Sequence, residues 1–255
     1  MMIVQSLWVG NKLSRMEYYS IKSFQKLGYN FILYTYEDVA NVPKGTIIKD
    51  ANDILEFEKV FTLKQSYLPF SDIWRYKMLY EVGGYWVDLD MIALKRFDEN
   101  TDEYIFSSEH TIVEGAFKSL LPYVANIGVL KAPKGSLFFK ELYDKCSKYN
   151  SSHNNDDKLK YMKIFRNQIK KYKLEQCIKP VNDFCPLDWW NAKEAFISVP
   201  QKKYGVQPSS IDDIINNSFT IHFWRDRITK KYKMDLDKKY NENSLWEKVL
   251  KKIDS

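Results

Sequence analysis

The segment from Gly83 to Asp90 constrains the fold of this chain more than any other. It reads Gly-Gly-Tyr-Trp-Val-Asp-Leu-Asp, so a short apolar run starts at a glycine pair and ends in two aspartates. Three bulky apolar residues between such boundaries predict a buried β-strand. Residues i and i+2 of an extended chain point the same way, so Asp88 and Asp90 are expected to direct both carboxylates at one spot.

Two carboxylates this close repel each other. At about 5 Å and an effective dielectric constant of about 20, the repulsion is roughly 3 kcal/mol. A fold keeps such a pair where water solvates both charges or where a cation lies between them. The apolar run before Asp88 puts the pair near the edge of the core, which favours the cation. Mg²⁺ and Mn²⁺ prefer oxygen ligands, typically one or two carboxylates together with substrate phosphates.

Composition narrows the class of protein. The chain has 255 residues, 45% of them hydrophobic, and few glycines or prolines, which predicts one globular domain over residues 1–255 without a long linker. A formal net charge of +6 falls short of the dense basic stripe of a nucleic-acid-binding protein, so nucleic acid is not expected as a partner. The three cysteines lack metal-like spacing and the first residues lack the features of a signal peptide, which predicts free thiols and a cytoplasmic location.

Apolar periodicity predicts an α/β fold. Strands are expected at residues 3–9, 31–34, 46–48, 85–87, 104–107, 126–130 and 219–224, and helices at 14–27, 53–59, 71–82, 138–149 and 158–173. The strand–helix–strand opening indicates a parallel sheet with a crossover helix, and a capping box at Ser14 to Glu17 starts that helix. A polar loop at 151–155 and the basic helix after it form a helical insertion near 151–175. A charged tail is expected after the last strand.

Asp72 and Arg75 share one face of the helix expected at 71–82, because they are three residues apart. Ser71 is the expected N-cap of that helix. A surface ion pair between Asp72 and Arg75 would contribute under about 1 kcal/mol. The alternative is that Arg75 offers its planar donors to a hydroxyl or phosphate while Asp72 accepts from a sugar hydroxyl. The acidic pair that follows favours this second interpretation.

This part of the chain contains, in order, Ser71-Asp72-x-x-Arg75-Tyr76, a glycine pair, an aromatic residue and Asp-x-Asp. The order resembles the sugar-binding D-x-D region of glycosyltransferase family 32. That family includes capsular-polysaccharide transferases and fungal mannosyltransferases, and the glucosylating domains of large bacterial toxins are its relatives. Three other segments are similar to parts of the same family. Residues 5–10 are similar to its first strand, residues 126–135 to its strand after the D-x-D, and residues 221–224 to its closing His-x-Trp.

The resemblance implies a GT-A fold, in which helices flank a nucleotide-sugar-binding sheet, and a reaction that retains anomeric configuration. It also implies a divalent cation, commonly Mn²⁺, with Mg²⁺ as the alternative. Asp90 would ligate the metal directly. Asp88 would serve the ribose or sugar of the donor, with the metal nearby or reached through water. His222 would be the third ligand, although a histidine in an apolar strand is by default a core residue.

Other matched residues would contact the donor. The implied set is Trp8, Ser71, Asp72, Arg75, Asp88, Asn126 and Trp224. Trp8 would lie against the nucleobase and Trp224 would reach the β-phosphate, whereas both are by default core aromatic residues. Asn126 would touch donor or acceptor, or would instead make a hydrogen bond at the start of a strand.

The predicted function is transfer of a hexose from a nucleotide diphosphate sugar, with a UDP-hexose favoured by Trp8, to a glycan or lipid-linked saccharide. Two alternatives stay open. A phosphotransferase of the haloacid-dehalogenase type also uses D-x-D after an apolar strand, but it expects Thr or Val at the position of Ile92. A non-catalytic carbohydrate-binding relative is the other.

Two further expectations concern the mechanism and the surface. No obvious carboxylate is placed as a covalent nucleophile, so a front-face displacement fits better than the two-carboxylate scheme of retaining glycosidases. The basic helix at 158–173 is either a solvated face or a peripheral contact with anionic lipid at the inner face of a membrane.

Overall fold

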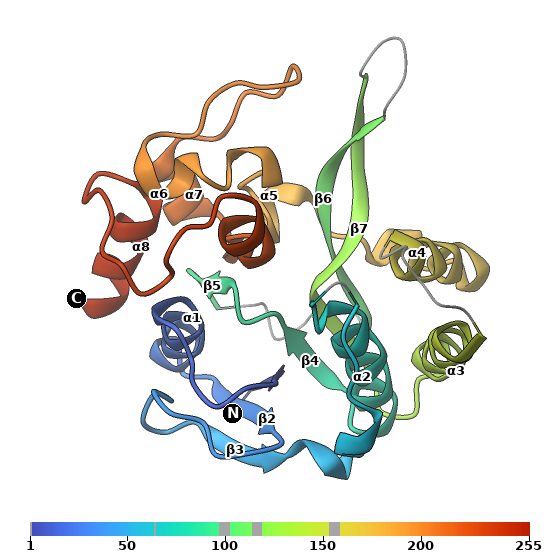
Figure 1. The fold of residues 1–255 in the computed structure, drawn as a ribbon. Coiled ribbons are helices and arrows are strands. Elements are labelled where there is room, and N and C mark those ends of the chain that lie inside the picture. Colours follow the sequence, from blue (N-terminus) through green and yellow to red (C-terminus); the bar gives the residue numbers. More distant parts are fainter. Residues whose placement is uncertain (1, 64, 97–102, 114–118, 153–158) are drawn as a thin grey trace.

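A six-stranded sheet runs through the centre of the computed structural model, in the strand order β3-β2-β1-β4-β7-β6 (Figure 1). The structure describes residues 2–63, 65–96, 103–113, 119–152 and 159–255. The strands are β1 (Ile3–Trp8), β2 (Asn30–Thr35), β3 (Ile47–Asp50), β4 (Gly84–Val87), β6 (Ile105–Val113) and β7 (Ser119–Ala132). Strands β1 to β4 are parallel, and β7 runs antiparallel to both of its neighbours. The predicted α/β class, a sheet flanked by helices, is confirmed.

Helices cover both faces of this sheet (Figure 1). One face packs against α2 (Leu68–Glu81), α3 (Leu137–Ser152) and α4 (Leu159–Tyr172), and the other against α1 (Arg15–Lys26). Beyond α1, a second sheet of β5 (Met91–Ala93) and β8 (Thr220–His222) is enclosed by the C-terminal part of the chain. The helices of that part are α5 (Val181–Phe184), α6 (Glu194–Ile197), α7 (Ile211–Asn217) and α8 (Leu245–Asp254).

Local sequence signals explain the first crossover. The predicted capping box is present at the start of α1, where the Ser14 side chain accepts from the backbone of the first turn and Glu17 accepts from the Ser14 N–H. Gly28 follows the end of α1 with a φ of 81°, a left-handed conformation that glycine adopts without steric cost. Strands β1 and β2 are therefore parallel neighbours at the expected positions.

The D-x-D segment differs from the expected extended chain. Strand β4 ends at Val87, and residues 88–90 form a turn closed by a hydrogen bond from the Met91 N–H to the Asp88 carbonyl at 3.0 Å. The extended geometry that we predicted for Asp88 and Asp90 is therefore wrong. The turn releases the chain from the main sheet, so that Met91 can begin β5 in the second sheet.

Two of the predicted helices also differ. Residues 53–59 do not form one helix but lie in two short 3₁₀ turns, Ala51–Asp53 and Phe57–Lys59. The cause is local capping, because the side chains of Asp50 and Asn52 bind backbone N–H groups that a continuing helix would need. Helix α2 starts at Leu68, three residues before the predicted N-cap Ser71, with a proline in its first turn.

The C-terminal segment is not a charged tail, and that expectation is wrong. Helix α8 buries one face, on which Leu245, Trp246 and Val249 are completely inaccessible to solvent. Glu247 on the same helix forms an ion pair with Arg15 of α1 at 2.7 Å. The helix expected at 158–173 is present as α4, and the predicted loop lies partly within α3, since Ser151 and Ser152 are helical. The rest of that loop, residues 153–155, lies outside the described residues.

Replacing Gly83 with alanine is expected to destabilise the fold by at least about 2 kcal/mol. Gly83 has a φ of 72°, and an added Cβ would lie 2.4 Å from the backbone nitrogen of Lys134. Gly135 is the matched control, because its φ is 81° but a Cβ there would meet nothing within 4 Å. Urea unfolding of both variants separates the clash from the cost of the left-handed backbone. Equal losses in the two variants would contradict the prediction.

Candidate active site

A cavity of about 600 Å³ lies at the carboxyl ends of β1 and β4. Its walls come from the D-x-D turn, the start of α2, strands β6 and β7 and the segment after β8. Ligands of open α/β sheets bind at this edge. All the site residues that the sequence singled out line this one cavity: Trp8, Ser71, Asp72, Arg75, Asp88, Asp90, Asn126, His222 and Trp224.

Hydrogen bonds fix both the side chain and the backbone of Asp88. Its Oδ1 accepts hydrogen bonds from Arg75 Nη1 at 2.8 Å and from Trp86 Nε1 at 2.9 Å. Its backbone N–H donates to the Gly128 carbonyl at 2.8 Å, which ties the turn to β7. Burial raises the pKa of Asp88, and the Arg75 guanidinium opposes that rise. The carboxylate is thus oriented by two donors on one oxygen.

Asp90 and His222 meet although 132 positions separate them in the chain. Strand β8 pairs with β5 so that His222 lies opposite Met91, which brings its Nε2 within 3.1 Å of Asp90 Oδ2. The same oxygen accepts from the Arg225 N–H at 2.8 Å. Burial disfavours the charged forms of Asp90 and His222. The attraction and the hydrogen bond between the two side chains outweigh this effect for each of them. The pKa of Asp90 is therefore lowered and the pKa of His222 is raised well above its usual value.

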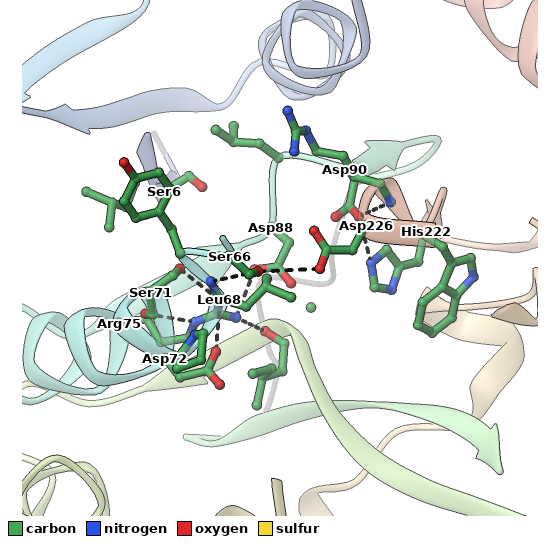
Figure 2. Close-up of a pocket in the computed structure, with 18 of the residues that line it drawn as sticks. Ser6, Ser66, Leu68, Ser71, Asp72, Arg75, Asp88, Asp90, His222 and Asp226 are labelled. Carbon is green, nitrogen blue, oxygen red and sulfur yellow. Dashed lines mark hydrogen bonds and ion pairs between the residues drawn. The ribbon is translucent and has the colours of Figure 1, made fainter. Parts of the chain in front are cut away.

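Asp88, Asp90 and His222 form a potential metal-binding set (Figure 2). One ligand atom from each lies within 4.8 Å of the other two. The hydrogen bonds among the described residues use Oδ1 of Asp88 and Oδ2 of Asp90, which leaves one oxygen of each carboxylate for a ligand. Two carboxylates and an imidazole suit Mn²⁺, and carboxylates suit Mg²⁺.

Arg75 has a different role from the one expected. Its side chain is 2% exposed, and four of its five N–H groups donate to protein acceptors. Nε donates to the Ser71 carbonyl, Nη1 to Asp88 and the Ile127 carbonyl, and Nη2 to Ser71 Oγ. Nη2 also forms an ion pair with Asp72 Oδ1 at 3.3 Å. Its guanidinium also lies 4.6 Å from the centre of the Trp86 ring. Arg75 therefore orients and neutralises carboxylates, and four of its five donors are engaged within the protein.

Ser71 and Asn126 are likewise engaged within the protein. Ser71 Oγ accepts from Arg75 at 3.0 Å. The Asn126 amide oxygen accepts from Ser107 Oγ, and its nitrogen donates toward Glu109 Oε2 at 3.4 Å and Cys185 Sγ at 3.3 Å. Asn126 is 4% exposed, so its hydrogen bonds between β6 and β7 are the better account of this residue.

The two tryptophans differ in what they leave for a ligand. Trp8 at the end of β1 lines the cavity, and its buried Nε1 has no hydrogen-bond partner among the described residues. Trp224 Nε1 donates to the Leu187 carbonyl at 2.8 Å, so in this arrangement it does not serve a phosphate as expected. The Trp224 ring stacks on His222 at 3.9 Å, and its φ of 57° is unusual for a bulky residue. Trp224 is therefore a support for the imidazole.

Several cavity residues were missed by the sequence analysis. They are Ser66, Glu109, Arg225, Asp226, Arg227 and Lys230. Arg225 donates from Nε to the fully buried Glu17 at 2.5 Å and lies 5.3 Å from the centre of the Trp8 ring, so the capping box of α1 also supports the site. Figure 2 shows Asp226 reaching toward Ser66, whose Oγ is 3.5 Å away. The run Arg-Asp-Arg directly after His-x-Trp is the signal that could have identified three of these residues.

The carboxyl edge of the sheet carries an acidic pair and a histidine, a set of ligands that a divalent cation could use. Residues 14–107 match the family described as "Glycosyltransferase sugar-binding region containing DXD motif". Asp88-Leu89-Asp90 is the Asp-x-Asp of that range. This part of the chain is therefore similar to a glycosyltransferase sugar-binding region, and the predictions of that resemblance and of a glycosyltransferase enzyme are confirmed.

The structure is similar to two solved proteins at low identity. One is titled "PaToxG Glycosyltransferase", with 16% identity, a TM-score of 0.48 and coverage of 86% of this chain and 88% of that one. The other is the apo-form glycosyltransferase GlyE of Streptococcus pneumoniae TIGR4, with 12% identity, a TM-score of 0.47 and coverage of 98% of this chain and 60% of that one. No curated protein sequence matches the chain.

Proposed function

We propose that the protein is a metal-dependent, retaining glycosyltransferase that moves a hexose from a nucleoside diphosphate sugar, favoured to be a UDP-hexose, onto a saccharide hydroxyl. The observation that carries the proposal is the set of Asp88, Asp90 and His222 in one cavity, with ligand atoms within 4.8 Å of one another. The sugar-binding family match over residues 14–107 supports the same reaction class.

The residues present fit a divalent cation. Asp88 and Asp90 are the oxygen ligands, each with one oxygen not used by the described residues, and His222 contributes the imidazole. When bound, Mn²⁺ or Mg²⁺ would stabilise the negative charge that develops on the diphosphate as the glycosidic bond breaks. The protein holds both carboxylates ready, since Arg75 and Trp86 orient Asp88 and the Arg225 N–H orients Asp90.

The remaining walls suit the other parts of a donor. Trp8 offers an aromatic face and an unsatisfied N–H at the end of β1, which supports a role against the nucleobase. Arg227 places positive charge at the cavity, where a diphosphate would lie, whereas the ammonium of Lys230 forms an ion pair with Asp226 at 3.0 Å. Asp72 supplies a carboxylate for a sugar hydroxyl. For retention, the acceptor hydroxyl attacks on the side of the leaving diphosphate: the C1–phosphate oxygen bond breaks, the C1–acceptor oxygen bond forms, and the hydroxyl proton passes to the phosphate oxygen.

The test is nucleotide release. The protein is incubated with Mn²⁺ and UDP-glucose, UDP-galactose, UDP-N-acetylglucosamine or GDP-mannose, and released nucleotide is measured. Release from one donor, lost with a chelator and restored by Mn²⁺, is the expected result. Phosphate release from phosphomonoesters would instead support the haloacid-dehalogenase alternative. Sugar binding without turnover would support a non-catalytic relative.

We also propose that α4 rests on anionic lipid and that the protein works in the cytoplasm at the inner face of a membrane, where a lipid-linked acceptor would be presented. The apolar side of α4 is buried in the core through Phe165 and Ile169, while Lys160, Lys163 and Lys170 are exposed. Such a contact is purely electrostatic. None of the helices in the described part of the chain is long and apolar enough to span a bilayer.

Replacing Lys160, Lys163 and Lys170 together with glutamine is expected to weaken binding to anionic vesicles by about 100-fold, since each lysine contributes about 1 kcal/mol. Flotation with phosphatidylserine vesicles at low and high salt measures this. The control replaces Lys238, Lys239 and Lys248, which are exposed in the C-terminal part of the chain, and so makes the same change in net charge elsewhere. Wild-type protein that fails to float at low salt would remove the idea.

A further inference from the structure

Glu109 places a carboxylate in the cavity that neither the sequence analysis nor the donor-binding roles account for. It lies on β6, opposite Val124 of β7, and lines the cavity. The register of the two strands shifts between Glu109 and Thr111. Such irregularities re-aim side chains beside binding sites. A charged residue in the otherwise small and apolar run Ile-Phe-Ser-Ser-Glu is the signal that could have identified it.

The contacts of Glu109 leave it capacity for a ligand. Asn126 Nδ2 donates toward its Oε2 at 3.4 Å, and Arg166 Nη2 lies 3.6 Å from its Oε1. A carboxylate accepts up to about four hydrogen bonds, and these two contacts are long. Arg166 is itself fixed by a hydrogen bond from Nε to the Ala125 carbonyl at 3.0 Å. The side chain of Glu109 is 22% exposed, so it is a partly desolvated acceptor with a cation beside it.

The order of the strands indicates which part of a substrate Glu109 faces. Along the sheet edge, Trp8 stands on β1, Asp88 follows β4, Asn126 is on β7 and Glu109 is on β6. Neighbouring strands are about 4.8 Å apart, so β6 lies about 10 Å beyond β4 and about 14 Å beyond β1. A donor whose base lies at β1 and whose diphosphate lies at the metal-binding set has its sugar beyond that set. The next position along the edge is that of the acceptor.

Charge supports the same assignment. An anionic diphosphate would be repelled by Glu109, whereas saccharide hydroxyl groups donate to a carboxylate. Asn126 links the two regions, because its amide contacts Glu109 and its Oδ1 accepts from the Gly128 N–H at 3.3 Å, while the Gly128 carbonyl holds Asp88. A single side chain, that of Asn126, therefore connects Glu109 to Gly128, the residue of β7 that holds Asp88. Met162 of α4 adds an apolar surface to this cavity.

We propose that Glu109 is the acceptor-binding residue of this enzyme and that its carboxylate accepts hydrogen bonds from the hydroxyl groups of a neutral saccharide. Arg166 keeps the carboxylate oriented, and Met162 covers the apolar face of the sugar ring. The inference rests on the proposed function. It assigns the β6 side of the cavity to the acceptor and the β1 side to the nucleoside.

The test compares Glu109→Gln with the wild type, using the donor from which the wild type releases nucleotide. Binding of UDP with Mn²⁺, measured by calorimetry, is expected to stay within about twofold, because the donor site is intact. Transfer to methyl glycosides of glucose, galactose and mannose is expected to fall about 10- to 100-fold, as for loss of a charge-assisted hydrogen bond, while transfer to water stays within about twofold. Glu58→Gln is the control, since Glu58 is an exposed glutamate on the 3₁₀ turn Phe57–Lys59, away from the cavity lining.

A second variant separates a role in binding from a role in folding. Adding formate to Glu109→Ala is expected to recover part of the lost transfer, which a merely structural glutamate would not show. Unchanged transfer in both Glu109 variants overturns the inference, and so does a loss of UDP binding equal to the loss of transfer. A wild type that binds donor but transfers to neither water nor methyl glycosides also overturns the inference. A wild type that binds no nucleotide sugar overturns the proposed function itself.

Discussion

Replacing Asp90 with asparagine is expected to lower kcat/KM for nucleotide release about a thousandfold, because several kcal/mol of charge stabilisation depend on this ligand. Asparagine keeps the size of the side chain and an oxygen that accepts from the Arg225 N–H, which Asp90 Oδ2 now binds at 2.8 Å. It removes the negative charge that a divalent cation needs. The fold should therefore survive while binding of Mn²⁺ is lost.

Two measurements check this result. Electron paramagnetic resonance counts free Mn²⁺ in the presence of each variant, and nucleotide release gives the rate. Asp144→Asn is the matched control, because Asp144 is 53% exposed on α3 and its ion pair within the described part of the chain is with a lysine one turn away. If Asp90→Asn bound Mn²⁺ and turned over as the wild type does, the metal-dependent mechanism would be wrong.

Replacing Arg75 with methionine is expected to destabilise the protein by about 3–5 kcal/mol, the usual cost of removing one partner from a buried ion pair. Methionine keeps much of the volume but removes the cation beside Asp72 and Asp88. Lysine should rescue little. Its ammonium has three donors and no planar fork, whereas Arg75 makes four hydrogen bonds to fixed acceptors.

Urea unfolding followed by tryptophan fluorescence measures the loss for Arg75→Met. The double variant Arg75→Met with Asp88→Asn should recover about 1–3 kcal/mol of it, because the charge that had lost its partner is then absent. A sugar-binding arginine would behave otherwise. It would lower activity with stability unchanged, and that outcome would contradict the supporting role given to Arg75 here.

The parts of the fold that depend on neighbouring residues were predictable. The capping box at Ser14 and the apolar run before Asp88 act over a few positions, so their effects appear in any local reading of the chain. The acidic pair was identified because it follows an apolar strand, and His222 was identified through the resemblance to glycosyltransferase family 32. The turn at 88–90 was not predicted, because the hydrogen bond that closes it competes with an extended chain of the same composition.

The sequence by itself predicted the acidic pair, because two carboxylates directly after an apolar strand stand out by their residue type. Tertiary packing decided what each of them does. The pairing of β5 with β8 brings His222 to Asp90, and burial places the Arg75 guanidinium against protein acceptors and the Trp86 ring. Because β6 pairs with β7, the charged residue Glu109 forms part of the cavity wall. The number of hydrogen bonds that a side chain can make is a property of the residue. Whether it makes them within the protein or to a ligand depends on residues that lie far away in the chain.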